Sequence, residues 1–507
     1  MQNDVSKCSH LGGGNRSDFF LISISIVAVG IIILCLLLNP KGSLEVANAL
    51  FSKLTSTYGS SVQLFEFICV LIILYVAFSK YGSIKLGVKE NPYSNIAWIF
   101  MFICAGLGSA TMYWAFMEWA FYYTGPGLNI APNSAEALRT STSFVYFHWG
   151  ITPWAVYALT SIAMCWHFYV KKNPELKLSA LLVNILGIKK NPILDKIIDI
   201  IFLFSTFGGL VLTTTVSVVT ISSGLAGIFG IENGFLIKFI ILAIVTAMFS
   251  ISSFVGLSAG MQKLAKLSCV LCFVFAVLVL LLGNSIFIIN NIINSIGLFF
   301  TNYVHMSLFN DATGTSSFNQ DWTVFYWLYW ITYTPAVSIF VTKISEGRTI
   351  RQVIFGLIVG GCIGTWFFFG CLTGYAIDTF IQGLVNVPEY LSNGAGEAGV
   401  LAVIQQLPLG NAFAIFYFIL MLVFLASHMD ATAFTISAVS TKIDSENPSK
   451  YLKVFWCIML GLIPLAMLYI NADLNTLKMA VVLTAAPFLI ILGIAAFGLI
   501  KWMKEYK

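Results

Sequence analysis

Residues 321–356 read DWTVFYWLYWITYTPAVSIFVTKISEGRTIRQVIFG, and this stretch joins an apolar segment to a basic turn. The apolar segment has the length, about 20 residues, that a helix needs to cross a hydrocarbon core of about 30 Å. Lys343, Arg348 and Arg351 follow it. Because Lys and Arg are retained on the cytoplasmic side of a membrane, the pattern predicts a transmembrane helix that ends in the cytoplasm.

Similar apolar segments recur along the whole chain. Of its 507 residues, 58% are hydrophobic and only 10% are charged, whereas a soluble globular chain is about 25% charged. Short segments of alternating polarity are absent, so the pattern indicates helices rather than barrel strands. We therefore predict an all-α integral membrane protein with twelve transmembrane helices. The expected spans are residues 19–38, 62–79, 95–122, 143–170, 197–228, 235–255, 268–298, 322–342, 353–375, 411–441, 454–471 and 479–500.

Basic residues are concentrated in alternate connections. The second, fourth, sixth, eighth and tenth connections and the C-terminal tail carry Lys or Arg, whereas the ninth carries Asp378, Glu389 and Glu397 and no basic residue. This asymmetry predicts that both termini are cytoplasmic. The first span is too long for the core of a secretory signal peptide. We expect a multi-pass protein of a bacterial plasma (inner) membrane, whose net charge of +5 reflects loop asymmetry and not a nucleic-acid partner.

Two spans contain residues that interrupt helices. The third contains Gly106 and Gly108 within CAGLGSATMYW, and the eighth contains Pro335 within WITYTPAVS. A glycine pair also serves close packing between helices. However, interrupted helices at corresponding places in two halves of a chain indicate the binding site of an inverted-repeat transporter. We therefore expect both spans to be interrupted near the middle of the membrane.

Two clusters of large aromatic residues lie inside apolar segments. The first is FHWGITPWAVY, residues 147–157, and the second is the aromatic run that begins at Trp322. Trp and Tyr are common at the membrane interface, which suffices to explain Trp322 at the start of its span. Rings two to three turns deeper instead suit a cage for a methylated ammonium group, which cation–π attraction holds by about 2 kcal/mol or more per good contact when desolvated.

Titratable residues also occur inside apolar spans. They are Glu118, His148, His167, His428 and Asp430. Such residues are costly in lipid and should face the interior of the bundle. LASHMDATAFTIS, residues 425–437, is the densest case, and it indicates either a satisfied polar contact between helices or an ion or proton site. Soluble-enzyme signatures are absent from the sequence, so we expect neither an enzyme nor a cofactor, and no metal site is assigned.

Residues 321–356 resemble the signature region of the betaine/carnitine/choline transporter family, which reads close to WTxFYWAWW…ARISRGRTIRE. FHWGITPWAVY matches the fourth helix of that family, and CAGLGSATMYWAFMEW resembles its third. The resemblance implies a homotrimer of protomers with a LeuT-like core of two inverted five-helix repeats. It divides the chain into a tail with two peripheral helices, a first repeat, an extracytoplasmic connection, a second repeat and a cytoplasmic tail, at residues 1–94, 95–298, 299–321, 322–500 and 501–507.

The resemblance also implies alternating access around an aromatic box that binds a small methylated amine. The implied box consists of Trp149, Trp154, Tyr157 and Trp330, with Trp327 and Tyr333 close by and Phe121 where carnitine carriers have a box Tyr. Betaine carriers read Gly-x-Gly-x-Gly in the interrupted helix, and choline carriers place Asp at the third position. Here the three positions are Gly106, Gly108 and Ala110. The methyl group of Ala110 favours a compact ligand such as trimethylamine.

Sodium-coupled members of the family place adjacent Thr and Ser hydroxyls on the tenth helix. Ser427 and His428 match these positions, and they would face Cys104 and Leu107, with Phe424 one turn earlier and Asp430 beside them. An imidazole is a poor ligand for a hard cation. We therefore expect exchange or proton-coupled antiport, in which His428 carries a proton or a fixed positive charge replaces the ion. A Na⁺-coupled betaine or choline symporter and a cation channel are the alternatives.

Overall fold

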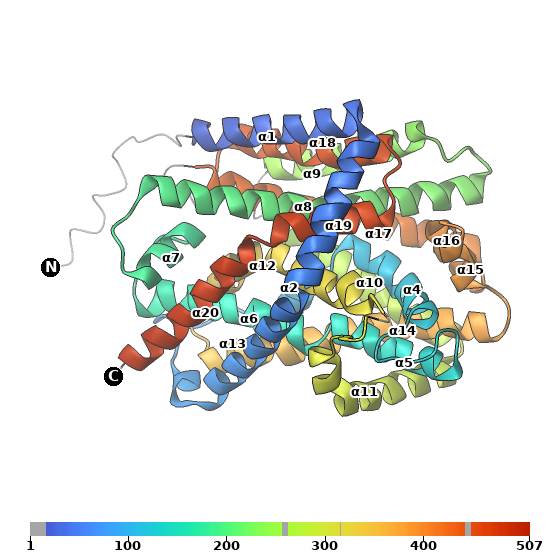
Figure 1. The fold of residues 1–507 in the computed structure, drawn as a ribbon, viewed down its shortest axis with the longest axis horizontal. Coiled ribbons are helices and arrows are strands. Elements are labelled where there is room, and N and C mark those ends of the chain that lie inside the picture. The colour runs from blue at the N-terminus through green and yellow to red at the C-terminus, as the bar shows by residue number, and fades with distance from the viewer. Residues whose placement is uncertain (1–16, 256–261, 315, 442–447, 507) are drawn as a thin grey trace.

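The computed structural model describes residues 17–255, 262–314, 316–441 and 448–506, and their fold is all-α (Figure 1). The first half contains α1 (Phe19–Leu38), α2 (Pro40–Phe78), α3 (Asn95–Gly106), α4 (Ser109–Thr124), α5 (Ala135–His148), α6 (Ile151–Cys165), α7 (Leu178–Leu186), α8 (Pro192–Phe229), α9 (Phe235–Val255) and α10 (Gln262–Leu282). The second half contains α11 (Ser285–Leu308), α12 (Val324–Ile344), α13 (Ile350–Phe355), α14 (Gly361–Ile381), α15 (Val387–Ser392), α16 (Gly396–Ile404), α17 (Gly410–Val439), α18 (Lys450–Tyr469), α19 (Leu474–Ala485) and α20 (Phe488–Glu505).

The membrane spans confirm the predicted class but not the predicted count of twelve. Within the described residues, nine helical segments are long and apolar enough to cross a membrane, and α19 with α20, bent by 45°, makes a tenth. The difference arises largely in α3 to α6, which contain 12 to 16 residues each. A single helix needs about 20 residues to span the hydrocarbon core. The chain is therefore an all-α integral membrane protein with short helices among its spans.

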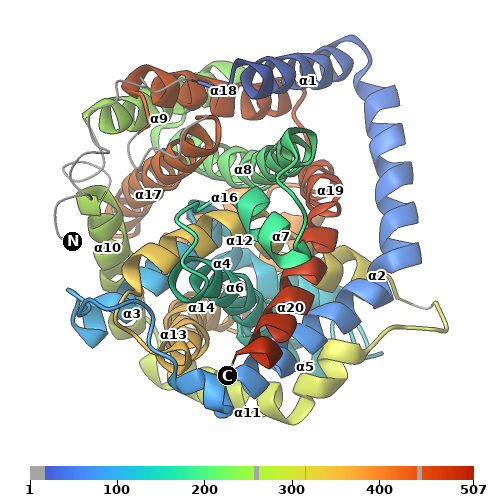
Figure 2. The same ribbon diagram turned by 90° about the vertical axis from the view of Figure 1, so that its left-hand side faces the viewer.

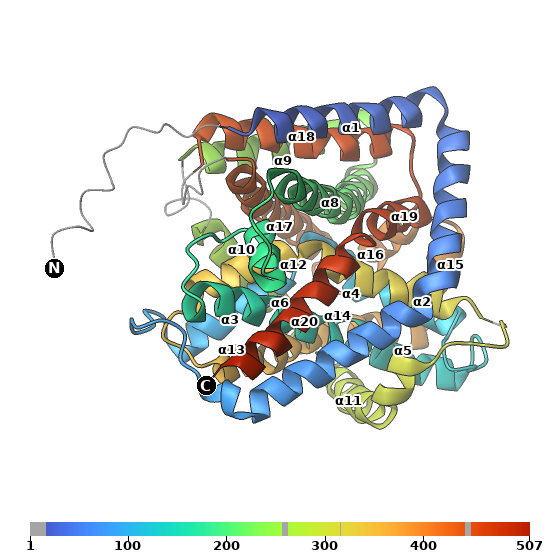
Figure 3. The ribbon, with the colours of Figure 1, turned by 60° about the vertical axis from the view of Figure 1, so that its left-hand side comes forward.

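The helices are arranged around α12. It packs against α6, α8 and α19 near the centre of the molecule (Figure 2). The helices α1, α9 and α18 form an outer layer, and α2 runs from that layer across the outside of the bundle (Figures 1 and 3). Apolar side chains on α2 and α11, such as Leu71 and Ile293, remain more than half exposed. Exposed apolar surface of this kind is expected where helices face lipid.

Two neighbouring spans are interrupted at the centre of the molecule. The third is interrupted at Gly108, as predicted. The fourth was expected as one helix over residues 143–170, which is wrong, because α5 and α6 are separated by Trp149 and Gly150. Side chains of α14 bind carbonyl groups at this interruption. Thr365 Oγ1 donates to the Trp149 carbonyl at 2.7 Å, and Trp366 Nε1 donates to the Tyr146 carbonyl at 3.0 Å. The interruption is thus stabilised by a tertiary contact.

The eighth span is not interrupted, contrary to the prediction. Helix α12 continues through Pro335. Hydroxyl groups supplement the backbone bonding of this turn, because Thr334 Oγ1 donates to the Trp330 carbonyl at 3.2 Å and Ser338 Oγ donates to the Pro335 carbonyl at 2.8 Å. Ser and Thr side chains commonly stabilise proline-containing helices in this way. The two expected interruptions are therefore not a symmetrical pair.

The seventh span is shorter than expected. The sequence predicts one helix over residues 268–298, but α10 ends at Leu282 and a separate helix, α11, begins at Ser285. Asn284 starts α11 by accepting the Phe287 N–H on its side chain at 3.2 Å, which is a typical helix cap. Helix α11 then packs across α5 and α14 at the edge of the molecule opposite α1 (Figure 1).

Contacts between connections gather both ends of the described chain on one face. Asp18 donates its backbone N–H to the Ser440 carbonyl, just after α17, at 2.7 Å. Lys177, in the connection after α6, donates to the carbonyl of the residue that follows Ser440 at 2.9 Å. Lys171, in the same connection, pairs with Glu505 at the end of α20 at 3.4 Å. The basic fourth connection thus lies on the same face as the start of α1 and the C-terminal end.

Candidate functional site

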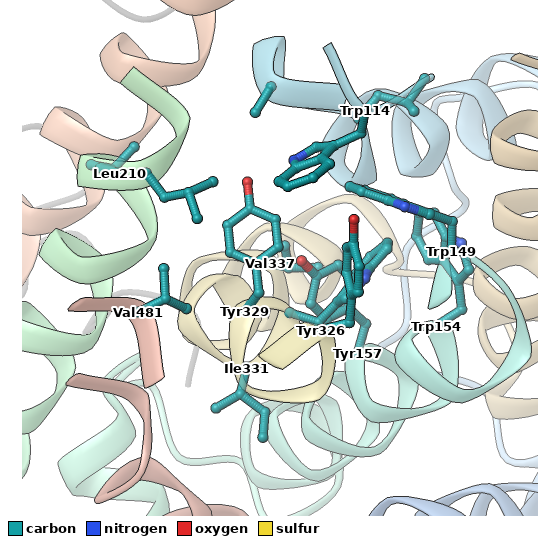
Figure 4. Close-up of a cluster of buried hydrophobic side chains, with 14 of the residues drawn as sticks. Trp114, Trp149, Trp154, Tyr157, Leu210, Tyr326, Tyr329, Ile331, Val337 and Val481 are labelled. Atoms are coloured by element: carbon teal, nitrogen blue, oxygen red, sulfur yellow. The ribbon is translucent and has the colours of Figure 1, made fainter. Parts of the chain in front are cut away.

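Four aromatic side chains expected to form the box meet in one buried cluster. Trp154 and Tyr157 of α6 contact Trp330 of α12, with ring centroids 5.5 and 4.9 Å apart. Trp149 contacts Trp330 at 5.4 Å. None of the four is more than 2% exposed. Figure 4 labels Trp149, Trp154 and Tyr157 together with Tyr326 of α12, whose ring centroid lies 5.5 Å from that of Trp149. We call the set of Trp149, Trp154, Tyr157 and Trp330 the aromatic cluster.

Two glycines hold the Trp154 indole. A Cβ atom on Gly106, at the end of α3, would overlap this indole, and so would one on Gly361, at the start of α14. The indole therefore fills a space between two backbones that no other residue type leaves open. Two residues after Gly106, Gly108 approaches α17, since a Cβ atom on Gly108 would lie 3.2 Å from His428 Nδ1. The interrupted third span thus faces the aromatic cluster and α17 through two glycines.

A buried carboxylate orients the cluster. Glu118 of α4 accepts hydrogen bonds on Oε2 from Trp149 Nε1 at 2.8 Å and from the Tyr326 hydroxyl at 2.7 Å. Its Oε1 accepts a bond from the Tyr122 hydroxyl at 2.6 Å. Glu118 is fully buried, and its oxygens have three donors. Because the carboxylate binds the Trp149 indole directly, the negative charge of its ionised form would lie beside the aromatic cluster.

His148 extends this network. Its Nδ1 lies 2.7 Å from the Tyr122 hydroxyl and 4.0 Å from Glu118 Oε1. Its Nε2 lies 3.2 Å from Thr323 Oγ1, just before α12. The backbone carbonyl of His148 accepts the Trp330 Nε1–H at 3.0 Å. The same network therefore fixes Trp149 through Glu118 and Trp330 through the His148 backbone.

Two residues outside the aromatic cluster are Trp327, which was expected close to the box, and Phe121, which was expected where carnitine carriers have a box Tyr. Trp327 packs against Phe147, with ring centroids 5.1 Å apart, and the ring of Phe121 lies 4.8 Å from that of Trp322. Phe121 and Trp322 line a separate cavity of about 390 Å³ together with Lys478. The Lys478 ammonium lies 3.9 Å from the centre of the Trp322 ring. This cavity is therefore occupied on one side by a cation of the protein itself.

Tyr333 and His428 form a contact between α12 and α17. Their ring centroids are 5.1 Å apart, and the planes meet edge to face. The Tyr333 hydroxyl donates to the Gly209 carbonyl at 2.8 Å and lies 2.7 Å from Thr213 Oγ1 of α8. Among the residues that the structure describes, no hydrogen bond involves the imidazole of His428. His428 is thus held by ring contacts, without a polar network of its own.

The other residues expected at the coupling site are not all brought together. Leu107, Phe424 and Ser427 are buried. The side chain of Cys104 is outside the part of the chain that the structure describes. Asp430 is directed away from the aromatic cluster, because both of its oxygens accept bonds from Ser252 and Ser253 of α9.

The contacts of Glu118 and His148 with the aromatic cluster were not predicted from the sequence. A local signal was available, because Glu118 and Tyr122 are four residues apart and so share one face of α4. The contacts with Trp149 and Tyr326 join residues 31 and 208 positions away in the sequence. Such contacts depend on how the helices pack, which spacing along the chain does not define.

Interrupted helices that meet around a buried aromatic cluster, within a bundle of membrane spans, are the architecture of a transporter. Residues 20–507 match the family model described as BCCT, betaine/carnitine/choline family transporter. The chain therefore belongs to this family, as its sequence motifs predicted. It is a multi-pass membrane transporter rather than an enzyme.

Three curated relatives match over nearly the full length. A protein of Acinetobacter baumannii named carnitine transporter is 42% identical over 96% of this chain and 89% of its own length. The uncharacterized transporter YeaV of Escherichia coli is 46% identical over 86% of this chain and 91% of its own. The glycine betaine transporter OpuD of Bacillus subtilis is 30% identical over 94% of this chain and 92% of its own.

Proposed function

We propose that the protein carries a small methylated ammonium compound across the membrane by alternating access, with the ammonium head held by the aromatic cluster. The observation that supports this most directly is the meeting of four buried rings at centroid distances of 4.9 to 5.5 Å. A cation within about 6 Å of a ring centroid is attracted by the ring, and most strongly by Trp. The named relatives support the same class of substrate, since one is a carnitine transporter and another a glycine betaine transporter.

The interrupted third span favours a compact substrate. Ala110 is fully buried in the first turn of α4, four residues after the glycine that seats Trp154. Its methyl group takes space where betaine carriers have Gly, and it offers no charge where choline carriers have Asp. Trimethylamine is the smallest candidate, and choline, glycine betaine and carnitine are the longer ones.

For coupling, we propose exchange or proton-coupled antiport in preference to Na⁺ symport. His428 places an imidazole against Gly108, where sodium-coupled members supply a hydroxyl. A hard cation prefers oxygen ligands, so this substitution weakens a sodium site. The hydroxyl of Ser427 is retained and favours the second candidate, a Na⁺-coupled symporter of betaine or choline.

The proposed mechanism extends to the whole architecture. Residues 95–298 and 322–500 would form two inverted five-helix repeats of a LeuT-like core, joined by residues 299–321. Residues 1–94 would supply the peripheral helices, and residues 501–507 a cytoplasmic tail. The face that carries the basic fourth connection and both ends of the described chain would be cytoplasmic. The working form would be a homotrimer in a bacterial inner membrane.

A substrate panel in proteoliposomes tests the proposal. Purified protein is assayed for counterflow of labelled trimethylamine, choline, glycine betaine and carnitine, with Na⁺ and proton gradients set separately. Saturable counterflow of at least one compound supports a carrier. Ohmic flux that does not saturate would instead identify a channel.

A further inference from the structure

We propose that Glu118, Tyr122 and His148 form a proton relay, and that the cationic substrate exchanges with the proton that this relay holds. The inference rests on the proposed function, because it requires an ammonium group in the aromatic cluster. It adds the groups that carry the coupled proton, which the sequence pattern had placed at His428. The relay is built from side chains of α4 and α5, whereas the coupling positions expected from the sequence, Ser427 and His428, lie on α17.

The first argument is the position of the carboxylate. Glu118 Oε2 lies 2.8 Å from Trp149 Nε1, and the Trp149 ring forms one side of the aromatic cluster. A cation held against this ring would have Glu118 as a neighbouring counter-charge, with one indole between them. An ionised carboxylate in a poorly solvated interior interacts strongly with such a cation. The substrate and a proton on the relay would therefore neutralise the same charge.

The second argument is that the network is complete without an extra proton. With Glu118 ionised, the Tyr122 hydroxyl donates to Oε1 at 2.6 Å, so His148 must donate to Tyr122 from Nδ1. The Nε2 of His148 then accepts from Thr323 Oγ1 at 3.2 Å. Each polar side chain of the relay therefore keeps a hydrogen-bond partner, as buried polar groups require.

The relay can also hold one more proton without losing a hydrogen bond. If Glu118 is protonated, it donates to Tyr122, Tyr122 donates to His148 Nδ1, and His148 donates from Nε2 to Thr323. The same three distances, 2.6, 2.7 and 3.2 Å, suit this arrangement equally, because only the donors and acceptors change places. The two arrangements differ by one proton. The relay therefore has two states in which all its hydrogen bonds are formed. The state with Glu118 ionised suits a bound cation.

Other titratable groups favour the ionised state when the site is filled. Tyr326 of α12 donates to Glu118 Oε2 at 2.7 Å and so stabilises the carboxylate. Lys478 of α19 lies over the Trp322 ring, which contacts the Tyr122 ring at 5.3 Å. These groups, with Tyr122 and His148, are the titratable and charged neighbours of the carboxylate among the described residues.

Three other titratable side chains of the described spans are not hydrogen-bonded to the aromatic cluster. Both carboxylate oxygens of Glu66, on α2, are without a hydrogen-bond partner among the described residues. Asp430 is bound by Ser252 and Ser253, away from the aromatic cluster. His428 contacts Tyr333 through ring faces and edges. Unlike these three, Glu118 binds a ring of the aromatic cluster directly, through Trp149 Nε1.

The exchange has a definite sign. When a cation enters the aromatic cluster, the proton leaves the relay to water on the side to which the site is open, and no covalent bond to the substrate forms or breaks. At low pH the relay is protonated, and binding of the cation is therefore weaker. For one exchanged proton, the dissociation constant rises by at most about tenfold for each unit of falling pH.

The test is calorimetric titration of the full-length protein with choline, glycine betaine and carnitine in two buffers of different ionisation enthalpy. The quaternary nitrogen of each ligand cannot lose a proton, so released protons come from the protein. We expect up to one proton to be released per bound ligand, with the released fraction growing as the pH falls from about 8 to about 6. Binding by the unmodified protein without proton release in this range would overturn the relay.

Variants assign the proton to Glu118. Glu118→Gln keeps hydrogen-bonding capacity but cannot ionise, so its release should fall to zero and its dissociation constant should no longer depend on pH. Glu118→Asp restores a carboxylate and should restore release. Glu66→Gln neutralises another buried acid and should leave release unchanged. Release from Glu118→Gln equal to that of the unmodified protein would overturn the assignment. Failure of these three ligands and of trimethylamine to bind the unmodified protein would overturn the proposed function, which is a different result.

Discussion

Trp330 is the residue on which the aromatic cluster depends. Its ring contacts those of Trp149, Trp154 and Tyr157, and its Nε1–H binds the backbone of α5. Trp330→Ala should weaken substrate binding by about 2 kcal/mol or more, which is roughly thirtyfold in dissociation constant. Trp330→Phe keeps a ring face and should retain part of the affinity. Trp327→Phe is the matched control, because that ring packs outside the cluster. Normal binding by Trp330→Ala would refute the assignment.

Gly106 gives a second test at the scale of single residues. An added methyl group would overlap the Trp154 indole and force it out of its seat between Gly106 and Gly361. Overpacking of this kind costs about 1–3 kcal/mol. Gly106→Ala should therefore lower both the substrate affinity and the thermal unfolding midpoint. Gly297→Ala, on α11 where no atom lies within 4 Å of the added methyl, should lower neither. Equal effects of the two variants would contradict the packing argument.

At the scale of elements, the sequence predicted the long apolar helices better than the interruptions. Apolar length is a local property, so a helix such as α9 follows from its own residues. Continuity is not local, since the stronger helix breaker, Pro335, lies inside a continuous helix. Gly150 lies at an interruption where Thr365 and Trp366 of α14 bind the freed carbonyls. These partners are more than 200 residues away, so no window of sequence includes them.

The turn between α12 and α13 gives an element-scale prediction. Its Gly347 donates N–H to the Leu86 carbonyl at 2.6 Å, and Leu86 donates to the Arg348 carbonyl at 2.8 Å. Gly347 has φ of +84°, and a Cβ there would lie 2.5 Å from the Lys89 carbonyl oxygen. Gly347→Ala should therefore lower the free energy of unfolding by the cost of a left-handed backbone, about 1–2 kcal/mol, and by the cost of the collision with Lys89. The unfolding midpoint in detergent should fall accordingly.

Gly394→Ala is the control for that experiment. Gly394 also has positive φ, at +66°, but nothing lies within 4 Å of an added methyl group. It should show the backbone cost alone, and thus a smaller fall in midpoint than Gly347→Ala. If the unfolding midpoints of the two variants fall equally, the pairing between the α12–α13 turn and the segment after α2 does not stabilise the fold.

At the scale of the whole molecule, the residues of the site were more predictable than their connections. The motif resemblance selected Trp149, Trp154, Tyr157 and Trp330, which the structure brings together. It could not reveal that Glu118 orients them, because that bonding joins α4, α5 and α12 through packing. The composition of a span shows that a buried acid needs a partner. Only the assembled bundle shows which partner it has.

Coupled transport by the whole molecule follows from the relay. If one proton leaves for each cation that enters, the exchange moves no net charge, so a pH gradient drives uptake and membrane potential does not. In proteoliposomes whose lumen is one unit more acidic than the medium, choline should accumulate up to about tenfold at equilibrium. This accumulation should not require Na⁺. It should persist in His428→Ala, whose ring is outside the relay, and be lost in Glu118→Gln. Accumulation that strictly requires a Na⁺ gradient would instead identify the sodium symporter.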